Sequence, residues 1–459
     1  MGARKLKVVV EAHGDWRDEL RRGERGALFA NPGNAISILR GEEQWQDVLA
    51  WDEFRNSITF LKEAPWYPVD GKPSKPGELW SEDDDVRLQA WFMRRWSFNL
   101  GRPDCYVAAR VVAREKRMHP VREWLSALRW DGVKRIDTWL TTYLGVQASD
   151  YTKLVGAWWM ISAVARAFVP GCKVDHVLIL EGHQGLAKST AVKVLTSPAW
   201  FSDAELDWHS KDKYLLIRGR WVFELAELAG LGKADLDRVK AFVTQARDDY
   251  RGPYEKHTAS VDRQTVFVGT VNPMADGTYP AFNDPTGNRR WWPVRCGHID
   301  LDAIAKDRDQ LWAEAVARYQ DPDRNSSRWW PDTPEERALC AGEQEQRAPE
   351  EVWQARIDWW LKQRAPGVQV SVGEVLTEAI KRELKDCSDG DKKRAGICIA
   401  RAGWVCVGRV RLDGAQARMY QRSSEAKDGQ APVGATASEV AEANPHDART
   451  STLDGSHGE

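Results

Sequence analysis

The sequence predicts an α/β protein whose centre is a parallel sheet covered by helices on both faces. Three observations lead to this expectation. Continuous apolar segments at residues 174–180, 220–224 and 265–271 are typical of strands that are buried on both faces. Helical periodicity fills the intervals between them, as in alternating strand and helix units. A glycine-containing stretch, EGHQGLAKST, directly follows the first strand, and we assign this core to residues 171–321.

The chain before this core is expected to form two parts. Residues 1–115 mix short apolar runs with Pro/Gly-rich loops and predict an N-terminal α+β region of unknown role. The acids Asp83, Asp84 and Asp85 precede a helical pattern, where we expect them to cap a helix N-terminus. From residue 116 to 170, apolar residues recur at intervals of three and four, which predicts a helical subdomain whose tryptophans pack in the core.

The stretch EGHQGLAKST nearly matches the phosphate-binding spacing G-x-x-x-x-G-K-[ST]. Lys188 and Ser189 occupy the expected positions, but Ala187 replaces the second glycine. Backbone N–H groups of such a loop surround phosphates, the lysine reaches the outer phosphates and the serine hydroxyl contacts Mg²⁺. If position 187 needs a positive φ, the alanine costs on the order of 1 kcal/mol. The expected nucleotide-binding residues are Gly182, His183, Gln184, Gly185, Leu186, Ala187, Lys188, Ser189 and Thr190.

Acidic side chains for the metal and the attacking water are expected at the tip of a neighbouring strand. Glu224 ends the second apolar segment and Glu227 follows three residues later. We assign Glu224 to Mg²⁺ and Glu227 to the water, with the two roles exchangeable; a pair of ordinary surface glutamates is the alternative. Asn272 ends the third segment, where it can hydrogen-bond the water or the γ-phosphate, unless it only forms an Asn-Pro turn.

Two adjacent arginines, Arg289 and Arg290, follow a Gly-Asn turn and precede an apolar WWPV strand. An arginine held by a short turn can enter the site of a neighbouring subunit and neutralise charge in the transition state. Plain salt bridges are the alternative, and a single chain does not distinguish the two.

Beyond the core, residues 322–349 are rich in Pro, Asp and Ser and predict a linker. Residues 350–422 predict three helices followed by a basic hairpin that turns at Asp413-Gly414, which is the order of a winged-helix-like DNA-binding domain. A plain α+β module with a solvated hairpin is the alternative. Residues 423–459 hold seven acidic and two basic residues and few aliphatic ones, so we expect a disordered acidic tail.

The composition of the whole chain narrows the functional classes. The net charge of −2 combines the acidic tail with a mildly basic remainder, which is compatible with nucleic acid without requiring it. The seven cysteines include no C-x-x-C pair, so neither a zinc ribbon nor a disulfide framework is indicated. The sequence has no apolar leader and no apolar run of membrane-spanning length, so we expect a protein of the bacterial cytoplasm without a membrane partner.

Five segments in this order resemble the virulence-associated E family: GHQGLAKST, WVFELAEL, KAFVTQARDDYRGPYEKHT, FVGTVNP and NDPTGNRRWWPV. The likeness extends over about residues 119–319. The family comprises superfamily 3-like helicase domains of phage, plasmid and genomic-island replication proteins. The resemblance therefore implies an AAA+-like P-loop NTPase core that binds ATP and Mg²⁺ and assembles as a ring, usually a hexamer.

The resemblance also implies residue roles. The phosphate-binding loop, the two glutamates, Asn272 and the adjacent arginines correspond to the Walker A, Walker B, sensor and arginine-finger elements of the family. A further stretch is implied to line the central channel and to contact single-stranded DNA; its candidate residues are Arg247, Arg251, Tyr254, Lys256 and His257. Cations and one stacking ring suit a loop that tracks a strand, and a solvated hairpin is the alternative.

Taken together, these features predict an ATP-dependent replicative DNA helicase of a mobile genetic element that translocates on single-stranded or forked DNA. Because the first 115 residues lack a convincing metal-binding acid pair, we expect a separate primase or replication initiator as a partner. The alternative function is a nucleotide-switched DNA-binding initiator or regulator without unwinding activity. A small-molecule P-loop kinase is disfavoured because the sequence gives no signal of a lid or substrate site.

Overall fold

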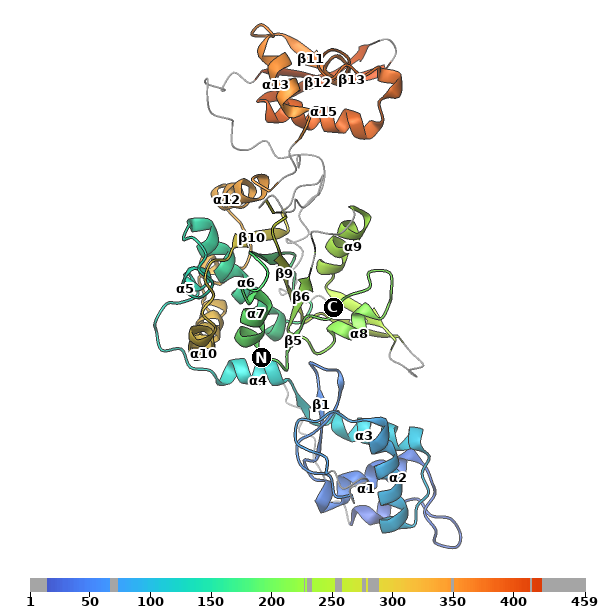
Figure 1. Cartoon of the computed structure of the whole chain (residues 1–459). Coiled ribbons are helices and arrows are strands. Elements are labelled where there is room, and N and C mark those ends of the chain that lie inside the picture. The colour runs from blue at the N-terminus through green and yellow to red at the C-terminus, as the bar shows by residue number, and fades with distance from the viewer. Residues whose placement is uncertain are drawn as a thin grey trace, which may run out of the picture. The chain divides into compact units, whose positions relative to one another are not determined.

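The computed structural model describes residues 15–66, 73–226, 228, 233–251, 258–274, 278–279, 289–347, 351–412 and 415–422 (Figure 1). The chain divides into two compact units. Unit 1 contains Met1–Pro280 and Arg290–Trp330, and unit 2 contains Ala281–Arg289 and Pro331–Glu459. None of the described helices is both long enough and apolar enough to cross a membrane. The tail predicted at 423–459 lies outside the described residues.

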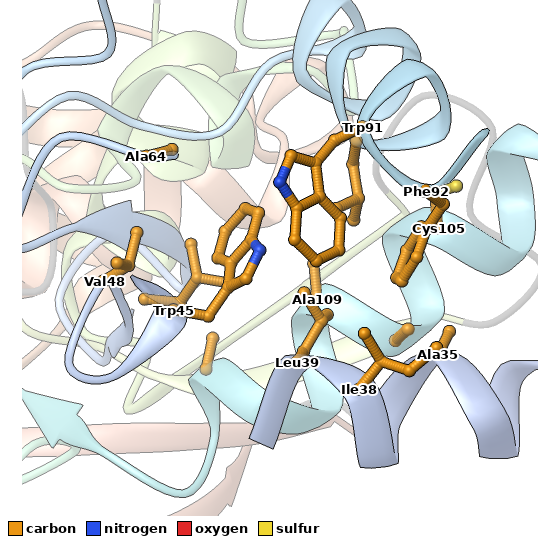
Figure 2. Packing of buried hydrophobic residues seen from close by; sticks show 14 of the residues in the cluster. Ala35, Ile38, Leu39, Trp45, Val48, Ala64, Trp91, Phe92, Cys105 and Ala109 are labelled. Atoms are coloured by element: carbon orange, nitrogen blue, oxygen red, sulfur yellow. The ribbon is translucent and has the colours of Figure 1, made fainter. Parts of the chain in front are cut away.

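The N-terminal part of unit 1 has an α+β arrangement with a core of its own. Strand β1 (Leu49–Asp52) lies between β2 (Ser57–Phe60), which is antiparallel to it, and β3 (Arg117–Met118), which is parallel. In the core, the Trp45 and Trp91 rings pack edge to face with centroids 5.5 Å apart (Figure 2). The helices of this part are η1 (Trp16–Glu19), α1 (Pro32–Gly41), η2 (Glu43–Trp45), α2 (Glu82–Trp96) and α3 (Arg102–Ala113).

The acids at the start of α2 cap this helix, as the sequence predicts. Ser81 precedes the helix and exchanges hydrogen bonds with Asp84 in a capping box. Asp85 Oδ1 accepts a hydrogen bond of 2.8 Å from the Trp80 indole. Asp83 lies in the same first turn, where the positive end of the helix dipole favours negative charge. These carboxylates are therefore accounted for by the helix terminus.

Three helices connect this part to the central sheet: α4 (Pro120–Ala127), α5 (Trp139–Leu144) and α6 (Asp150–Phe168). Most of α6 is buried, and the Trp159 indole donates a hydrogen bond of 2.9 Å to the Phe267 carbonyl on the sheet. Trp158 and Trp159 are core residues, as predicted, with exposed fractions of 3% and 1%. The last of the predicted helices thus packs directly on the sheet.

A five-stranded parallel sheet forms the centre of unit 1. The strand order is β10-β4-β9-β6-β5, and every neighbouring pair is parallel. Its strands are β4 (Val177–Glu181), β5 (Phe201–Ser202), β6 (Val222–Ala226), β9 (Val266–Val271) and β10 (Trp291–Arg295). The three predicted apolar segments are β4, β6 and β9, and the predicted WWPV strand is β10. Strand β5 has only two residues and was not predicted.

Helices cover both faces of this sheet, as predicted (Figure 1). On one face α6, α7 and α10 pack together, and the Trp312 indole of α10 donates to the Leu195 carbonyl of α7 at 2.8 Å. On the other face, the ring of Phe242 in α9 contacts Phe267 of β9. Strands β7 (Arg247–Tyr250) and β8 (Ala259–Asp262) form a separate antiparallel ribbon. The helices are α7 (Lys188–Thr196), α8 (Lys213–Ile217), α9 (Lys233–Val243), α10 (Leu301–Tyr319) and α11 (Arg324–Ser327).

The described part of unit 2 combines helices with a three-stranded sheet of order β11-β13-β12. Its buried core includes Ile357, Ile399 and Tyr420. The elements are α12 (Pro334–Glu345), α13 (Gln354–Lys362), β11 (Gln369–Ser371), α14 (Val372–Glu374), η5 (Val375–Ala379), η6 (Leu384–Asp386), α15 (Asp389–Arg401), β12 (Trp404–Leu412) and β13 (Ala415–Arg422).

Two features of this region bear on the sequence expectations. Helix α12, which begins with a Thr333 capping box, lies inside the stretch 322–349 that was expected to be a linker. Strands β12 and β13 are antiparallel and pair up to Leu412↔Ala415, so they form the expected hairpin. The turn predicted at Asp413-Gly414 lies outside the described residues.

Candidate nucleotide site

The stretch EGHQGLAKST has the expected strand-loop-helix context. Strand β4 ends at Glu181 and helix α7 begins at Lys188. Ala187, the residue before the helix, is left-handed with φ 62° and ψ 29°, and Gly185 has φ 87°. Position 187 therefore has the backbone conformation that glycine usually supplies in this motif, and the alanine methyl group costs about 1 kcal/mol there. The loop keeps the motif's shape in spite of the substitution.

The rest of the predicted nucleotide-binding stretch is continuous and fully described. His183, Gln184 and Gly185 are exposed, whereas Gly182 is buried at the base of the loop. A Cβ at position 182 would meet Leu186 Cδ1 at 2.7 Å, so the loop closes tightly around this glycine. Thr190 is exposed in the first turn of α7.

Lys188 joins the loop to the neighbouring strand β9. Its Nζ donates to the carbonyls of Gly182 and His183 at 2.6 and 2.9 Å and to Asn272 Oδ1 at 3.1 Å. Burial lowers the pKa of Lys188, and the nearby Cys296 and Glu224 act in the opposite direction. The lysine is thus held at the mouth of the loop by neutral oxygen atoms. An anion placed there would gain a desolvated cation as its partner.

Glu224 is the centre of a second group of contacts. Its Oε1 accepts hydrogen bonds from Ser189 Oγ at 2.7 Å and from Thr270 Oγ1 at 2.5 Å. The residue is 3% exposed, and its other oxygen, Oε2, is buried without a hydrogen-bond partner among the described residues. A buried carboxylate oxygen with no partner is costly unless something else satisfies it.

These side chains meet because of the strand order. Strand β9 lies between β4 and β6, and all three are parallel, so their carboxyl ends reach the same edge of the sheet. The loop follows β4, Glu224 lies near the end of β6 and Asn272 follows β9 directly. The predicted meeting of Lys188, Glu224 and Asn272 is therefore present in the structure.

The donor set fits Mg²⁺ that is held jointly with nucleotide phosphates. Ser189 supplies a hydroxyl and Glu224 supplies the buried oxygen without a partner. Within the described ranges, no group of three or more His, Cys, Asp or Glu side chains is arranged to hold a metal ion. Because Mg²⁺ is usually bound by one or two carboxylates together with substrate phosphates and water, this sparse set suits it.

Of the two predicted arginines, Arg290 lies at the amino ends of the strands, opposite the phosphate loop. Arg290 immediately precedes β10, and its carbonyl accepts from the amide of Val177 at the first residue of β4. Strands β10 and β4 are parallel, so about four residues of strand, roughly 13 Å, separate this end from the phosphate loop. Arg289 is exposed and Arg290 is half-buried. Neither contacts Lys188 of its own chain in the described structure.

The candidate DNA-contacting stretch is described only in part. Arg247 begins β7 and forms an ion pair of 2.7 Å with Asp262 on β8. Arg251 directly follows β7 and is exposed. Tyr254, Lys256 and His257 lie outside the described residues, as does the second candidate acid, Glu227.

Three residues at this edge were not predicted. Thr270 bonds Glu224, and its spacing of two from Asn272 along β9 is the signal that could have identified it, since alternate strand residues share a face. Arg295 ends β10 with its Nε 3.8 Å from Glu181 at the end of β4. Cys296 follows it, and burial raises the pKa of this thiol to about 12 in spite of the nearby Lys188.

Comparison with known proteins adds a family to this geometry. Residues 125–349 match the model of the virulence-associated protein E-like domain. No curated protein matches the chain. A solved structure described as "The A form apo structure of NrS-1 C terminal region-CTR" is similar at 14% sequence identity, covering 65% of this chain and 78% of that chain, with a TM-score of 0.38. The family match includes all five strands of the central sheet and hence the whole group of contacts described above.

Proposed function

Because residues 125–349 form a virulence-associated protein E-like domain, a P-loop NTPase domain of mobile-element replication proteins, we propose that the chain is an ATP-dependent replicative DNA helicase. It hydrolyses ATP with Mg²⁺ and uses the energy to translocate on single-stranded DNA at a fork. In this proposal the core is a superfamily 3-like, AAA+-related motor of a phage, plasmid or genomic island that acts in the cytoplasm of the bacterial host.

The observation that supports hydrolysis most directly is the pair of contacts across three strand tips. Lys188 Nζ lies 3.1 Å from Asn272 Oδ1, and Ser189 Oγ lies 2.7 Å from Glu224 Oε1. A lysine, a hydroxyl, a carboxylate and an amide are the groups that phosphoryl transfer to water needs. Because these groups already contact one another, they lie close to the arrangement that the reaction requires.

Each of these groups has a separate role in the proposal. Lys188 exchanges its loop carbonyl partners for the outer phosphates, and the positive end of α7 adds to this attraction. Ser189 and the free oxygen of Glu224 hold Mg²⁺, which neutralises charge on the phosphates when bound. Asn272 orients the attacking water, and Glu227 polarises it, with the roles of the two glutamates exchangeable.

The location of Arg290 supports a ring. Since Arg290 directly precedes β10 at the amino ends of the strands, opposite the loop, it is not positioned to serve the site of its own chain. A trans-acting finger needs this geometry, because it has to enter the site of the next subunit. We therefore propose a homo-oligomeric ring, a hexamer by family resemblance, whose channel residues include Arg247 and Arg251.

The C-terminal domain supplies a second contact with DNA in this proposal. Its order of α13, β11, the short helices α14, η5 and η6, α15 and the β12–β13 hairpin is compatible with the winged-helix-like fold that we propose. Such a domain would bind DNA through its own surface. A separate primase or initiator would act together with this chain, because Asp83, Asp84 and Asp85 in its N-terminal part lie in the first turn of α2, where they stabilise the helix terminus.

Strand displacement on a forked duplex with 3′ and 5′ tails tests the proposal. The wild-type chain should unwind the fork and hydrolyse ATP faster with single-stranded DNA, and Lys188→Ala should lose both activities. Lys193→Ala is the matched control, because Lys193 is an exposed lysine on the same helix α7 and should leave both activities unchanged. Equal ATPase rates with and without DNA would count against a motor.

The same experiment separates the alternative function. A nucleotide-switched initiator or regulator would bind duplex DNA only when nucleotide is present, but it would displace no strand. In that case Glu224→Gln, which should block hydrolysis, would leave the DNA-bound state unchanged.

A further inference from the structure

The β12–β13 hairpin carries three arginines on one face. The pairing register sets Arg409 directly opposite Arg418 and Arg411 directly opposite Gln416. Alternate residues of a strand share a face, so Arg409, Arg411, Arg418 and Gln416 lie together. All four are exposed. The opposite face holds Val410, Ala417 and Met419, so the part of the ribbon beyond the buried Tyr420 has one cationic and one mainly apolar face.

Among the described residues, these arginines have no acidic partners. Neither β12 nor β13 contains an aspartate or glutamate. In the part of the chain that the structure describes, no ion pair joins Arg409, Arg411 or Arg418 to a carboxylate. Two like charges directly across an antiparallel pair destabilise it. Such a conflict within a folded element typically marks a functional surface.

Cations of the neighbouring helix α15, in contrast, form ion pairs with carboxylates. Arg394 forms an ion pair of 2.6 Å with Glu351, and Lys392 forms one of 3.1 Å with Asp389. Arg401 lies 4.0 Å from Glu345. The helix therefore presents cations that are already partly neutralised, whereas the hairpin presents cations that are not.

We infer that the arginine face of the β12–β13 hairpin binds the phosphate backbone of double-stranded DNA and is the main DNA contact of the C-terminal domain. This inference rests on the proposed function, from which it takes DNA as the ligand. What it adds is the surface that binds and the double-stranded form of the DNA. It differs from the usual expectation that a helix makes the main contact in a domain of this kind.

The chemistry of the face favours duplex over single-stranded DNA. Binding of single strands uses aromatic rings on which bases stack. The hairpin's aromatic residues, Trp404 and Tyr420, are buried in the core of the domain. What the face offers is arginines whose Cβ positions are about 5 Å apart across the strands and about 7 Å apart along β12. A two-stranded ribbon also fits the major groove of B-form DNA, where arginines reach phosphates on both sides.

Fluorescence anisotropy with the full-length chain and a labelled blunt duplex tests this inference. The triple variant R409Q/R411Q/R418Q should bind at least tenfold more weakly at moderate salt, and the slope of log affinity against log salt should fall by about 3, one for each lost phosphate contact. The matched control is K385Q/K392Q/K393Q, which removes the same charge from η6 and α15 and should stay within about twofold of the wild type.

Two further measurements make the result decisive. ATP hydrolysis without DNA should be unchanged in the hairpin variant, which shows that the motor is folded, and R409K/R411K/R418K should retain most of the affinity because it keeps the charge. The inference is overturned if the control triple loses as much affinity as the hairpin triple, or if the hairpin triple binds duplex like the wild type. It is also overturned if only a single-stranded oligonucleotide loses affinity. Since none of these readouts requires unwinding, they remain independent of the helicase proposal.

Discussion

The nucleotide loop and the β12–β13 hairpin both carry cationic side chains, but the cation of the loop is buried and hydrogen-bonded, whereas those of the hairpin are exposed. Lys188 is 7% exposed and donates hydrogen bonds to three oxygen atoms. Arg409 and Arg418 are exposed, face each other and have no carboxylate partner among the described residues. A buried charge needs partners because its desolvation is costly, whereas an exposed one remains stable in water. The comparison indicates that the loop is preorganised for chemistry and the hairpin for capture of a polyanion.

The largest effect is expected when the negative charge of Glu224 beside the nucleotide loop is removed. Glu224→Gln keeps the shape of the side chain and its acceptor oxygen for Ser189, but it removes the negative charge. We expect ATP hydrolysis to fall by about 10² to 10³-fold, the usual cost of removing one group that supports charge stabilisation in the transition state. Nucleotide affinity should remain within about threefold, because Lys188 and the loop amides are unchanged. Phosphate release and titration with a fluorescent ATP analogue measure the two effects.

Glu205→Gln is the matched control for this variant. Glu205 is an exposed glutamate in the loop after β5, and its replacement should alter neither hydrolysis nor binding. If both glutamines reduce hydrolysis equally, or if Glu224→Gln hydrolyses ATP normally, then the contacts around Glu224 are structural and not catalytic.

Much of the loop edge could be predicted from the sequence because local patterns encode it. Continuous apolar segments identified β4, β6 and β9, and the rule that parallel strands end at one edge brought Lys188, Glu224 and Asn272 together. The sequence could not establish that Ala187 has a positive φ, because this backbone angle depends on how the loop closes.

What could not be predicted depends on contacts between distant segments. Thr270 reaches Glu224 because β9 lies beside β6 in a register that pairs Thr270 with Ala226; sequence spacing puts Thr270 on the face of Asn272, but it does not give this register. Helix α6 packs on the sheet through Trp159, whose indole nitrogen finds a partner more than a hundred residues away. The cationic face of the hairpin likewise depends on the register of β12 and β13. A shift of the pairing by one residue would move the side chains of one strand to the other face.

A smaller effect is expected from the substituted glycine of the loop. Ala187→Gly should stabilise the fold by about 0.5 kcal/mol, because relief of the left-handed strain, about 1–2 kcal/mol, exceeds the entropy that glycine adds to the unfolded chain, about 0.4–1 kcal/mol. Ala191→Gly in the interior of α7 should instead destabilise by about 1 kcal/mol. Urea unfolding followed by tryptophan fluorescence compares the two. Shifts of the same sign would show that position 187 is not strained.

The smallest effect is expected from a single substitution in the β12–β13 hairpin. Arg418→Gln removes one of two like charges that face each other, so the free energy of unfolding should rise by about 0.2–1 kcal/mol at low salt. The gain should fade at high salt, where the repulsion is already screened. Arg411→Gln should give a smaller gain, because Arg411 faces Gln416 and not a cation. Thermal unfolding at two ionic strengths measures both; a loss of stability at Arg418 that does not depend on salt would mean that this guanidinium supports the fold and is not held free for a ligand.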